Sequence, residues 1–188
     1  VYTVLASGVC GARSIACEPI EKARSDLRSN VAANRIGDRV EIHQCAVGAT
    51  VGTVHMLDDR DTMNRVVTDG DYDSGVEVPV TTLDHLLKDR EPTLIKIDVE
   101  GFEEQVLAGA DKALQSKSLL AVTLEAGPFA ADGGERRRTL CATMAQYGFK
   151  AASYDPLNRI LVPMDNADCR GDDIIFVRDL ERIGSDLK

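Results

Sequence analysis

The sequence predicts an α/β fold built on a mainly parallel β-sheet. Runs of apolar and β-branched residues alternate along the chain with segments in which apolar residues recur at helical spacing. That alternation is typical of strands joined by crossover helices, which cover both faces of the sheet. The 188 residues suffice for one domain of ordinary size, and no internal repeat or low-complexity linker divides them. We therefore expect a single domain over residues 1–188.

The first fifty residues predict a βαβ unit. Residues 13–19 form a short strand that Pro19 ends, and a helix follows from about 20 to 34. The apolar side chains of that helix share one face, and its charged side chains are expected to face water: Glu21, Lys22, Arg24, Asp26 and Arg28. Residues 40–47 then give the second strand. The whole unit has the length of a strand, helix, strand crossover.

The next segment predicts two strands and a long loop. Residues 52–57 and 76–81 have strand character, and residues 58–75 between them are polar and rich in Asp. A loop of that length in a compact domain is either a substrate loop or lid, or a solvated insertion. A short helix is expected at 84–87.

The middle of the chain predicts the centre of the sheet. Residues 93–99 are almost continuously apolar, as a central strand buried on both faces should be. Helix, strand and helix follow in turn at 101–115, 119–125 and 133–147. The last third contains short strands joined by turns, which predicts antiparallel strands added at the sheet edge, at 150–154, 159–163 and 174–178.

Composition and charge argue against nucleic acid and membranes as main partners. The net charge of −9 opposes binding to nucleic acid or anionic lipid, and eight scattered aromatic residues do not make a base-stacking platform. No apolar run approaches the roughly 18 residues of a membrane-spanning helix. The five cysteines form no C-x-x-C pair and have no histidine at metal-ligand spacing. They predict reduced thiols, mostly core fillers, in a cytoplasmic protein.

Acidic residues close three of the predicted strands. Glu18 follows the first strand, Asp98 and Glu100 follow the strand at 93–99, and Glu125 ends the strand at 119–125. Ligands of open α/β sheets bind outside the carboxyl ends of the strands. A single acid there is often a helix cap, but three strands ending in acids indicate a site.

Glu18 indicates a cofactor that contains adenosine. An acid at the end of the second strand of a nucleotide-binding half accepts hydrogen bonds from both ribose hydroxyls. NAD and S-adenosylmethionine present the same diol, so Glu18 does not decide between them. The glycine loop does bear on it, because a pyrophosphate needs G-x-G-x-x-G. The sequence contains no such loop, and Gly8 and Gly11 follow a predicted helix and not a strand.

One long segment resembles a known family. Residues 95–110, IKIDVEGFEEQVLAGA, resemble the signature segment of the FkbM family of S-adenosylmethionine-dependent methyltransferases. Shorter matches support the resemblance at 17–19, 30–34, 38–40, 46–48 and 173–178. The resemblance implies a Rossmann-like class I methyltransferase fold and methylation of a hydroxyl oxygen.

The family pattern begins with a strand and an Asp-x-Gly-Ala-Asn-x-Gly loop, and Val1 corresponds to the position directly after that loop. The strand would lie between those ending at Glu18 and Asp98. Its absence would leave two rows of unpaired backbone groups. We therefore expect the 188 residues to be a piece of a longer chain, N-terminally truncated relative to the family.

The resemblance and the strand ends together give candidate site residues. Asp98 is the first candidate for a general base, and its alternative role is to contact the cofactor. Glu100 is expected to cap the helix starting at Gly101, with its charge at the positive end of the helix dipole. The remaining candidates divide by role, with Glu18, Pro19, Ala46, Val47 and Asp98 for the cofactor and Asn64, Glu100 and Glu125 for the substrate.

Other polar residues are left out of the site. His43, His55 and His85 are scattered, and scattered histidines are more often structural than catalytic. The run Arg136, Arg137 and Arg138 at a helix start is expected to be a solvated face.

The function predicted is S-adenosylmethionine-dependent O-methylation of a small molecule or sugar, by in-line displacement in a dry pocket. No metal is assigned and the oligomeric state is left open. Three alternatives are a nicotinamide-dependent oxidoreductase, a non-catalytic domain with an incomplete cofactor site, and a metal-dependent methyltransferase. In the last of these, Asp98 and Glu125 would hold a hard cation through oxygen ligands.

Overall fold

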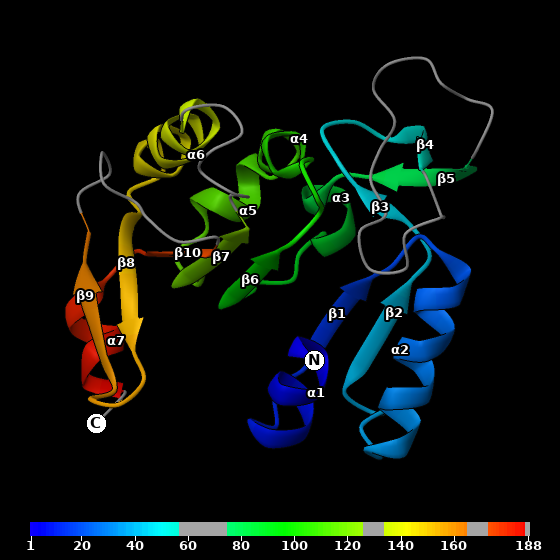
Figure 1. The fold of residues 1–188 in the computed structure, drawn as a ribbon, viewed down its shortest axis with the longest axis horizontal. Coiled ribbons are helices and arrows are strands. Elements are labelled where there is room, and N and C mark those ends of the chain that lie inside the picture. Colours follow the sequence, from blue (N-terminus) through cyan, green and yellow to red (C-terminus); the bar gives the residue numbers. More distant parts are fainter. Residues whose placement is uncertain (57–74, 126–133, 165–172, 187–188) are drawn as a thin grey trace. The chain divides into compact units, whose positions relative to one another are not determined.

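The computed structural model describes residues 1–56, 75–125, 134–164 and 173–186, and it divides into two compact units, residues 1–81 and 82–188 (Figure 1). The first unit contains helices α1 (Tyr2–Val4) and α2 (Glu21–Ala33) and a π-helix, η1 (Leu5–Val9). Its strands are β1 (Ser14–Cys17), β2 (Val40–His43), β3 (Ala46–Val47), β4 (Gly52–Met56) and β5 (Val76–Thr81).

The predicted βαβ unit is present in this first unit. Strands β1 and β2 are parallel, with Ser14 opposite Val40 and Cys17 opposite His43, and α2 connects them. The helix packs its apolar start into a core with strands β3, β4 and β5, formed by Ile20, Ala46, Met56, Val78 and Val80.

The strand predicted at 40–47 is two strands. Strand β2 pairs with β1, whereas β3 pairs in parallel with β5. A bend at residues 44–45 separates β2 from β3. The two strands therefore belong to different sheets. Both halves of the segment have strand character, so the change of pairing partner leaves no trace in the residue pattern.

The second unit is built on a five-stranded sheet in the order β6-β7-β10-β8-β9. Its strands are β6 (Leu94–Ile97), β7 (Ala121–Glu125), β8 (Lys150–Asp155), β9 (Ile160–Pro163) and β10 (Asp173–Val177). Its helices are α3 (Leu83–Leu87), α4 (Glu103–Ala108), α5 (Asp111–Gln115), α6 (Glu135–Gln146) and α7 (Leu180–Asp186). The C-terminal strands are antiparallel, as predicted.

Two expectations for this unit are corrected. The segment at 93–99 is not a central strand of the described sheet. It forms β6, which is the edge strand of that sheet and pairs there with β7, and Leu94 is 59% exposed. The helix predicted at 101–115 is two helices that separate at Gly109 and Ala110. The carboxylate of Asp84 accepts hydrogen bonds from the N–H groups of Lys112 and Ala113, at 2.9 Å each, and so caps a new helix.

Candidate functional site

Glu18 lies where β1 leaves its sheet, as the sequence predicts. Its N–H donates to the carbonyl of His43 at 3.0 Å, and pairing stops at Pro19 because proline has no N–H. Oε1 of the Glu18 carboxylate accepts a hydrogen bond from the N–H of Ile20 at 2.9 Å. Ile20 precedes α2 and has no side-chain cap of its own. The carboxylate is thus held at the positive end of the helix.

Burial raises the pKa of the Glu18 carboxyl, while the N–H of Ile20 and the charge of Arg24 act in the opposite direction. The side chain is half-buried. A partly desolvated carboxylate with hydrogen-bonding capacity left over is a suitable acceptor for a pair of hydroxyl groups.

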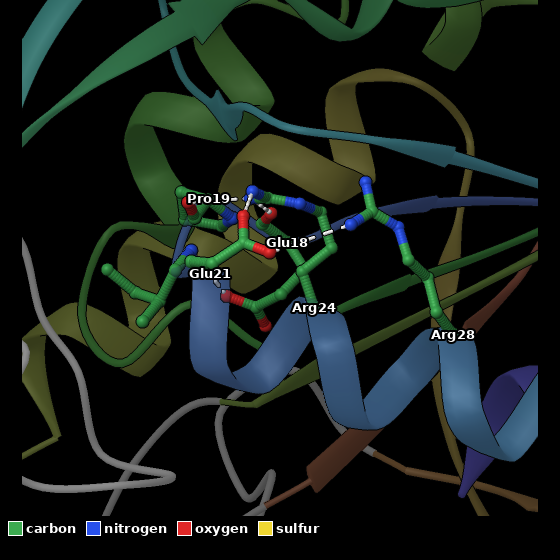
Figure 2. A network of polar contacts seen from close by, with 6 residues as sticks. Glu18, Pro19, Glu21, Arg24 and Arg28 are labelled. Atoms are coloured by element: carbon green, nitrogen blue, oxygen red, sulfur yellow. Dashed lines mark hydrogen bonds and ion pairs between the residues drawn. The ribbon is translucent and has the colours of Figure 1, made fainter.

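The prediction that Arg24 faces water is wrong. The residue is 1% exposed, and its Nη1 donates to the carbonyl oxygens of Glu18 at 3.1 Å and Pro19 at 3.0 Å (Figure 2). Its Nη2 pairs with the carboxylate of Glu21, which Arg28 also approaches at 3.6 Å. The helical pattern places Arg24 among the charged positions, but its guanidinium reaches back under the turn between β1 and α2.

Ala46 and Val47 form β3 and point to opposite sides of it, as successive strand residues do. The Ala46 side chain is buried in the core with Ile20, and Val47 is half-buried. Of the two, the Val47 side chain and the backbone of β3 are therefore the groups that a planar base could contact.

Two thiols meet beside these cofactor candidates. Cys17 ends β1, Cys45 immediately precedes β3, and their side chains are hydrogen-bonded to each other. The bond raises the pKa of the Cys17 thiol and lowers that of Cys45. Both are free cysteines, as are Cys10 and Cys141. Cys45 and Cys141 are buried, as predicted for core fillers, whereas Cys17 is half-buried and Cys10 is exposed.

In the second unit, the acids predicted at two strand ends come together. Strands β6 and β7 are parallel with Ile97 opposite Leu124, so Asp98 and Glu125 follow at the same edge. One carboxylate oxygen from each of Asp98, Glu100 and Glu125 lies within 4.8 Å of the others. We call these three residues the acidic cluster.

Glu125 is the titrating member of the acidic cluster. Its pKa is raised to about 7, first by a hydrogen bond with Asp98, then by burial and by the charges of Asp98 and Glu100, with Lys96 acting in the opposite direction. Oε2 of Glu125 is buried and meets no donor in the described part of the chain. Two ionised carboxylates cannot hydrogen-bond, so this bond forms when the Glu125 carboxyl carries its proton.

Lys96 and Asp173 complete the surroundings, and neither is among the candidates from sequence. Lys96 Nζ lies 3.5 Å from Asp98 Oδ2 and 2.6 Å from Asp173 Oδ1. Asp173 stands opposite Glu125 because β10 runs antiparallel to β7. The single lysine within an apolar strand is the signal that could have found Lys96. Asp173 could be found only from the pairing of β10 with β7.

A buried glutamate supports the loop that carries Asp98 and Glu100. Glu103 is 1% exposed, and its Oε1 accepts hydrogen bonds from the N–H groups of Val99 and Gly101, at 3.3 Å each. Its other oxygen pairs with Arg136 of α6.

Two expectations about this region are wrong. Helix α4 begins at Glu103 and not at Gly101, and its N-cap residue is Phe102, so Glu100 is not the N-cap. Of the three arginines predicted to form a solvated face, only Arg138 is exposed. Arg136 pairs with the buried Glu103, and Arg137 is 4% exposed.

The candidate residues thus fall in two places. Glu18, Pro19, Ala46 and Val47 belong to the first unit, and the acidic cluster belongs to the second. Asn64 lies outside the described residues. A carboxyl group with a pKa of about 7, such as Glu125, can accept a proton from a hydroxyl group. Three carboxylates are also the kind of ligand that Mg²⁺ or Ca²⁺ takes. No helix in the described ranges has the length and apolar character needed to cross a bilayer.

Comparisons with known proteins give a family and a fold. The family described as the methyltransferase FkbM domain matches residues 2–151. Among solved structures, a methyltransferase FkbM from Methylobacillus flagellatus KT is similar, with a TM-score of 0.59 and 16% sequence identity. The match covers 94% of this chain and 40% of that one. At this identity the likeness concerns the fold, and it confirms the predicted Rossmann-like α/β class. No curated protein sequence matches significantly.

Proposed function

The chain belongs to the FkbM methyltransferase domain family, and from this premise we propose that it is an S-adenosylmethionine-dependent methyltransferase. The observation that carries the proposal is the position of Glu18, a half-buried carboxylate held at the carboxyl end of β1 and the start of α2. That is the place at which an acid accepts hydrogen bonds from a ribose diol in nucleotide-binding folds. The methyl acceptor is a hydroxyl group of a small molecule or sugar.

The residues of the first unit would hold the adenosine part of the cofactor. Glu18 would bind the ribose hydroxyls, with Pro19 fixing the turn beside it. The backbone of β3 and the Val47 side chain would contact the adenine. S-adenosylmethionine supplies an electrophilic methyl group when bound, so the protein chiefly aligns the acceptor and excludes water.

The acidic cluster would serve the acceptor. A hydroxyl oxygen is a better nucleophile when its proton is taken up as the bond forms. The Asp98 and Glu125 pair has a carboxyl whose pKa is about 7, so it can gain or lose a proton at neutral pH. A carboxylate oxygen of Glu100 lies within 4.8 Å of oxygens of Asp98 and Glu125, and Glu100 would bind the acceptor.

Calorimetric titration tests the cofactor assignment. S-adenosylmethionine, S-adenosylhomocysteine and NAD are titrated separately into the protein and into the variants Glu18→Gln and Glu77→Gln. Glu77 is an exposed glutamate on β5 of the same unit and serves as the matched control. We expect S-adenosylmethionine and S-adenosylhomocysteine to bind. Of the two variants, only Glu18→Gln should weaken their binding, by about tenfold or more.

Three results would contradict the proposal: no binding of S-adenosylmethionine, binding that Glu18→Gln leaves unchanged, or binding of NAD in its place. Repeating the titration with EDTA and with added Mg²⁺ shows whether a hard cation takes part, since the acidic cluster has oxygen ligands only.

A further inference from the structure

The turn between β1 and α2 depends on a buried cation. Two successive carbonyl groups, those of Glu18 and Pro19, point to Nη1 of Arg24 at 3.1 and 3.0 Å. Pro19 cannot continue the backbone pairing of β1, and carbonyl groups that turn inward need donors. One guanidinium nitrogen supplies both hydrogen bonds (Figure 2).

An arginine suits this place better than a lysine. Its planar fork offers donors in fixed directions, so Nη1 holds the two carbonyls while Nη2 pairs with Glu21. A buried cation without a counter-charge would be costly. Glu21 supplies that charge from the first turn of the same helix, with a side chain that is 69% exposed. The buried contacts of the guanidinium are its two hydrogen bonds to the carbonyl groups of the turn.

Arg24 also acts on the charge of Glu18. Its positive charge favours the ionised carboxylate, together with the N–H of Ile20 and against the effect of burial. Among the described residues, the Cys17 thiol at the end of β1 also interacts with the charge of Glu18. Without Arg24, burial would meet less opposition, and the carboxyl would keep its proton to a higher pH.

We propose that Arg24 is a positioning residue for cofactor binding, which aims the Glu18 carboxylate at the ribose by fixing the carbonyl groups of Glu18 and Pro19. The inference rests on the proposed function, since it assumes that Glu18 binds the ribose. It adds a residue that does not touch the cofactor and yet sets how tightly and over what pH range the cofactor binds.

A double-mutant cycle tests this coupling. The affinity for S-adenosylmethionine is measured by calorimetry from pH 5 to pH 8 for Arg24→Met, Arg24→Lys, Glu18→Gln and the two double variants. The control is Arg28→Gln, which removes a cation that pairs with Glu21 but does not contact the turn. Circular dichroism confirms that each variant is folded.

With Glu18 present, Arg24→Met should weaken binding about tenfold or more at pH 7 and move the acid limb of the affinity profile to higher pH. Arg24→Lys keeps the charge but loses the fork, so it should leave the acid limb in place and weaken binding only a few-fold. In the Glu18→Gln background both substitutions should have little effect on affinity. Arg28→Gln should bind as the parent protein does.

A loss of affinity that is the same in the Glu18→Gln background would overturn the inference, because Arg24 would then support the fold and not Glu18. An acid limb that Arg24→Met leaves in place would overturn it as well. If Arg24→Met does not fold, the cycle of Arg24→Lys with Glu18→Gln gives the same comparison. Cofactor binding that Glu18→Gln alone leaves unchanged would instead overturn the proposed function together with the inference.

Discussion

Glu103 and Arg136 form an ion pair beneath the loop that carries Asp98 and Glu100. The backbone of this loop takes positive φ at two successive residues, Glu100 at +47° and Gly101 at +107°, and only at Glu100 does this carry a steric cost. A positive φ is uncommon for a residue other than glycine. The family segment thus contributes two kinds of residue, those whose carboxylates meet in the acidic cluster and one that holds them there.

The first prediction concerns this buried pair. Replacing Glu103 by Ala removes the acceptor for two loop N–H groups and removes the carboxylate that pairs with the Arg136 guanidinium. The Arg136 side chain is 27% exposed, so the cost comes mainly from the N–H groups of Val99 and Gly101. A buried donor left without an acceptor costs about 1–3 kcal/mol, so Glu103→Ala should lower the free energy of unfolding by roughly 2–5 kcal/mol. Urea denaturation measures it.

Glu104→Ala is the control, because Glu104 is the exposed neighbour on the same helix. It should change the free energy of unfolding by less than about 0.5 kcal/mol. Equal effects of the two substitutions would contradict the role assigned to Glu103.

The sequence was a good guide to the elements that local pattern decides. The βαβ unit, the antiparallel C-terminal strands and the acids at strand ends follow from periodicity and from Pro19, and each is present. The breaks at residues 44–45 and at Gly109 were missed because they depend on partners far along the chain. For the second break, that partner is Asp84, which caps α5.

Side-chain environments were harder to predict than elements. A helical pattern treats every arginine as polar, but a long side chain can bury its head under a neighbouring turn, as Arg24 does. The raised pKa of Glu125 requires Asp98 beside it, and that follows from the register of β6 with β7, which no single segment encodes.

The second prediction is a pH dependence set by Asp98 and Glu125. The Glu125 pKa is about 7 in the folded protein against an ordinary value of 4.5, so the folded state binds this proton more tightly than the unfolded state. The contribution to stability is therefore complete below pH 4.5 and is lost as the pH rises through 7. Asp98→Asn removes the largest cause, so the Glu125 carboxyl should titrate at lower pH.

Carboxyl ¹³C NMR follows that titration directly, and thermal unfolding between pH 4.5 and 7 should become less pH-dependent in Asp98→Asn. The control is Asp89→Asn, because Asp89 is exposed and lies outside the acidic cluster. A Glu125 titration curve that Asp98→Asn leaves in place would show that burial and the charge of Glu100, and not Asp98, raise the pKa.

The third prediction concerns Arg178, which joins three segments of the second unit. Its guanidinium donates to the carbonyls of Leu119, Tyr147 and Leu114, at 3.1, 2.7 and 2.6 Å. It also lies 4.2 Å from the centre of the Phe149 ring. Arg178→Met removes all three hydrogen bonds and should lower the free energy of unfolding by roughly 3 kcal/mol.

Arg178→Lys should recover little of this stability, because an ammonium group cannot reproduce the planar fork or the ring contact. Lys117→Met, which removes an exposed cation, should have almost no effect in the same urea denaturation. Full recovery by lysine would mean that charge alone accounts for the contribution of Arg178.

The last prediction concerns the hydrogen-bonded thiols of Cys17 and Cys45. The bond from Cys17 is the largest cause that lowers the Cys45 pKa, and burial acts against it. Cys17→Ala removes that bond and leaves burial, so the Cys45 pKa should rise and less thiolate should be present at pH 8. The thiolate absorbance near 240 nm measures this between pH 6 and pH 9, below the range in which tyrosines ionise. Cys10→Ala, which removes an exposed thiol, should take away only its own part of the titration. If Cys17→Ala changes the curve no more than Cys10→Ala does, the Cys17 thiol does not stabilise the thiolate of Cys45.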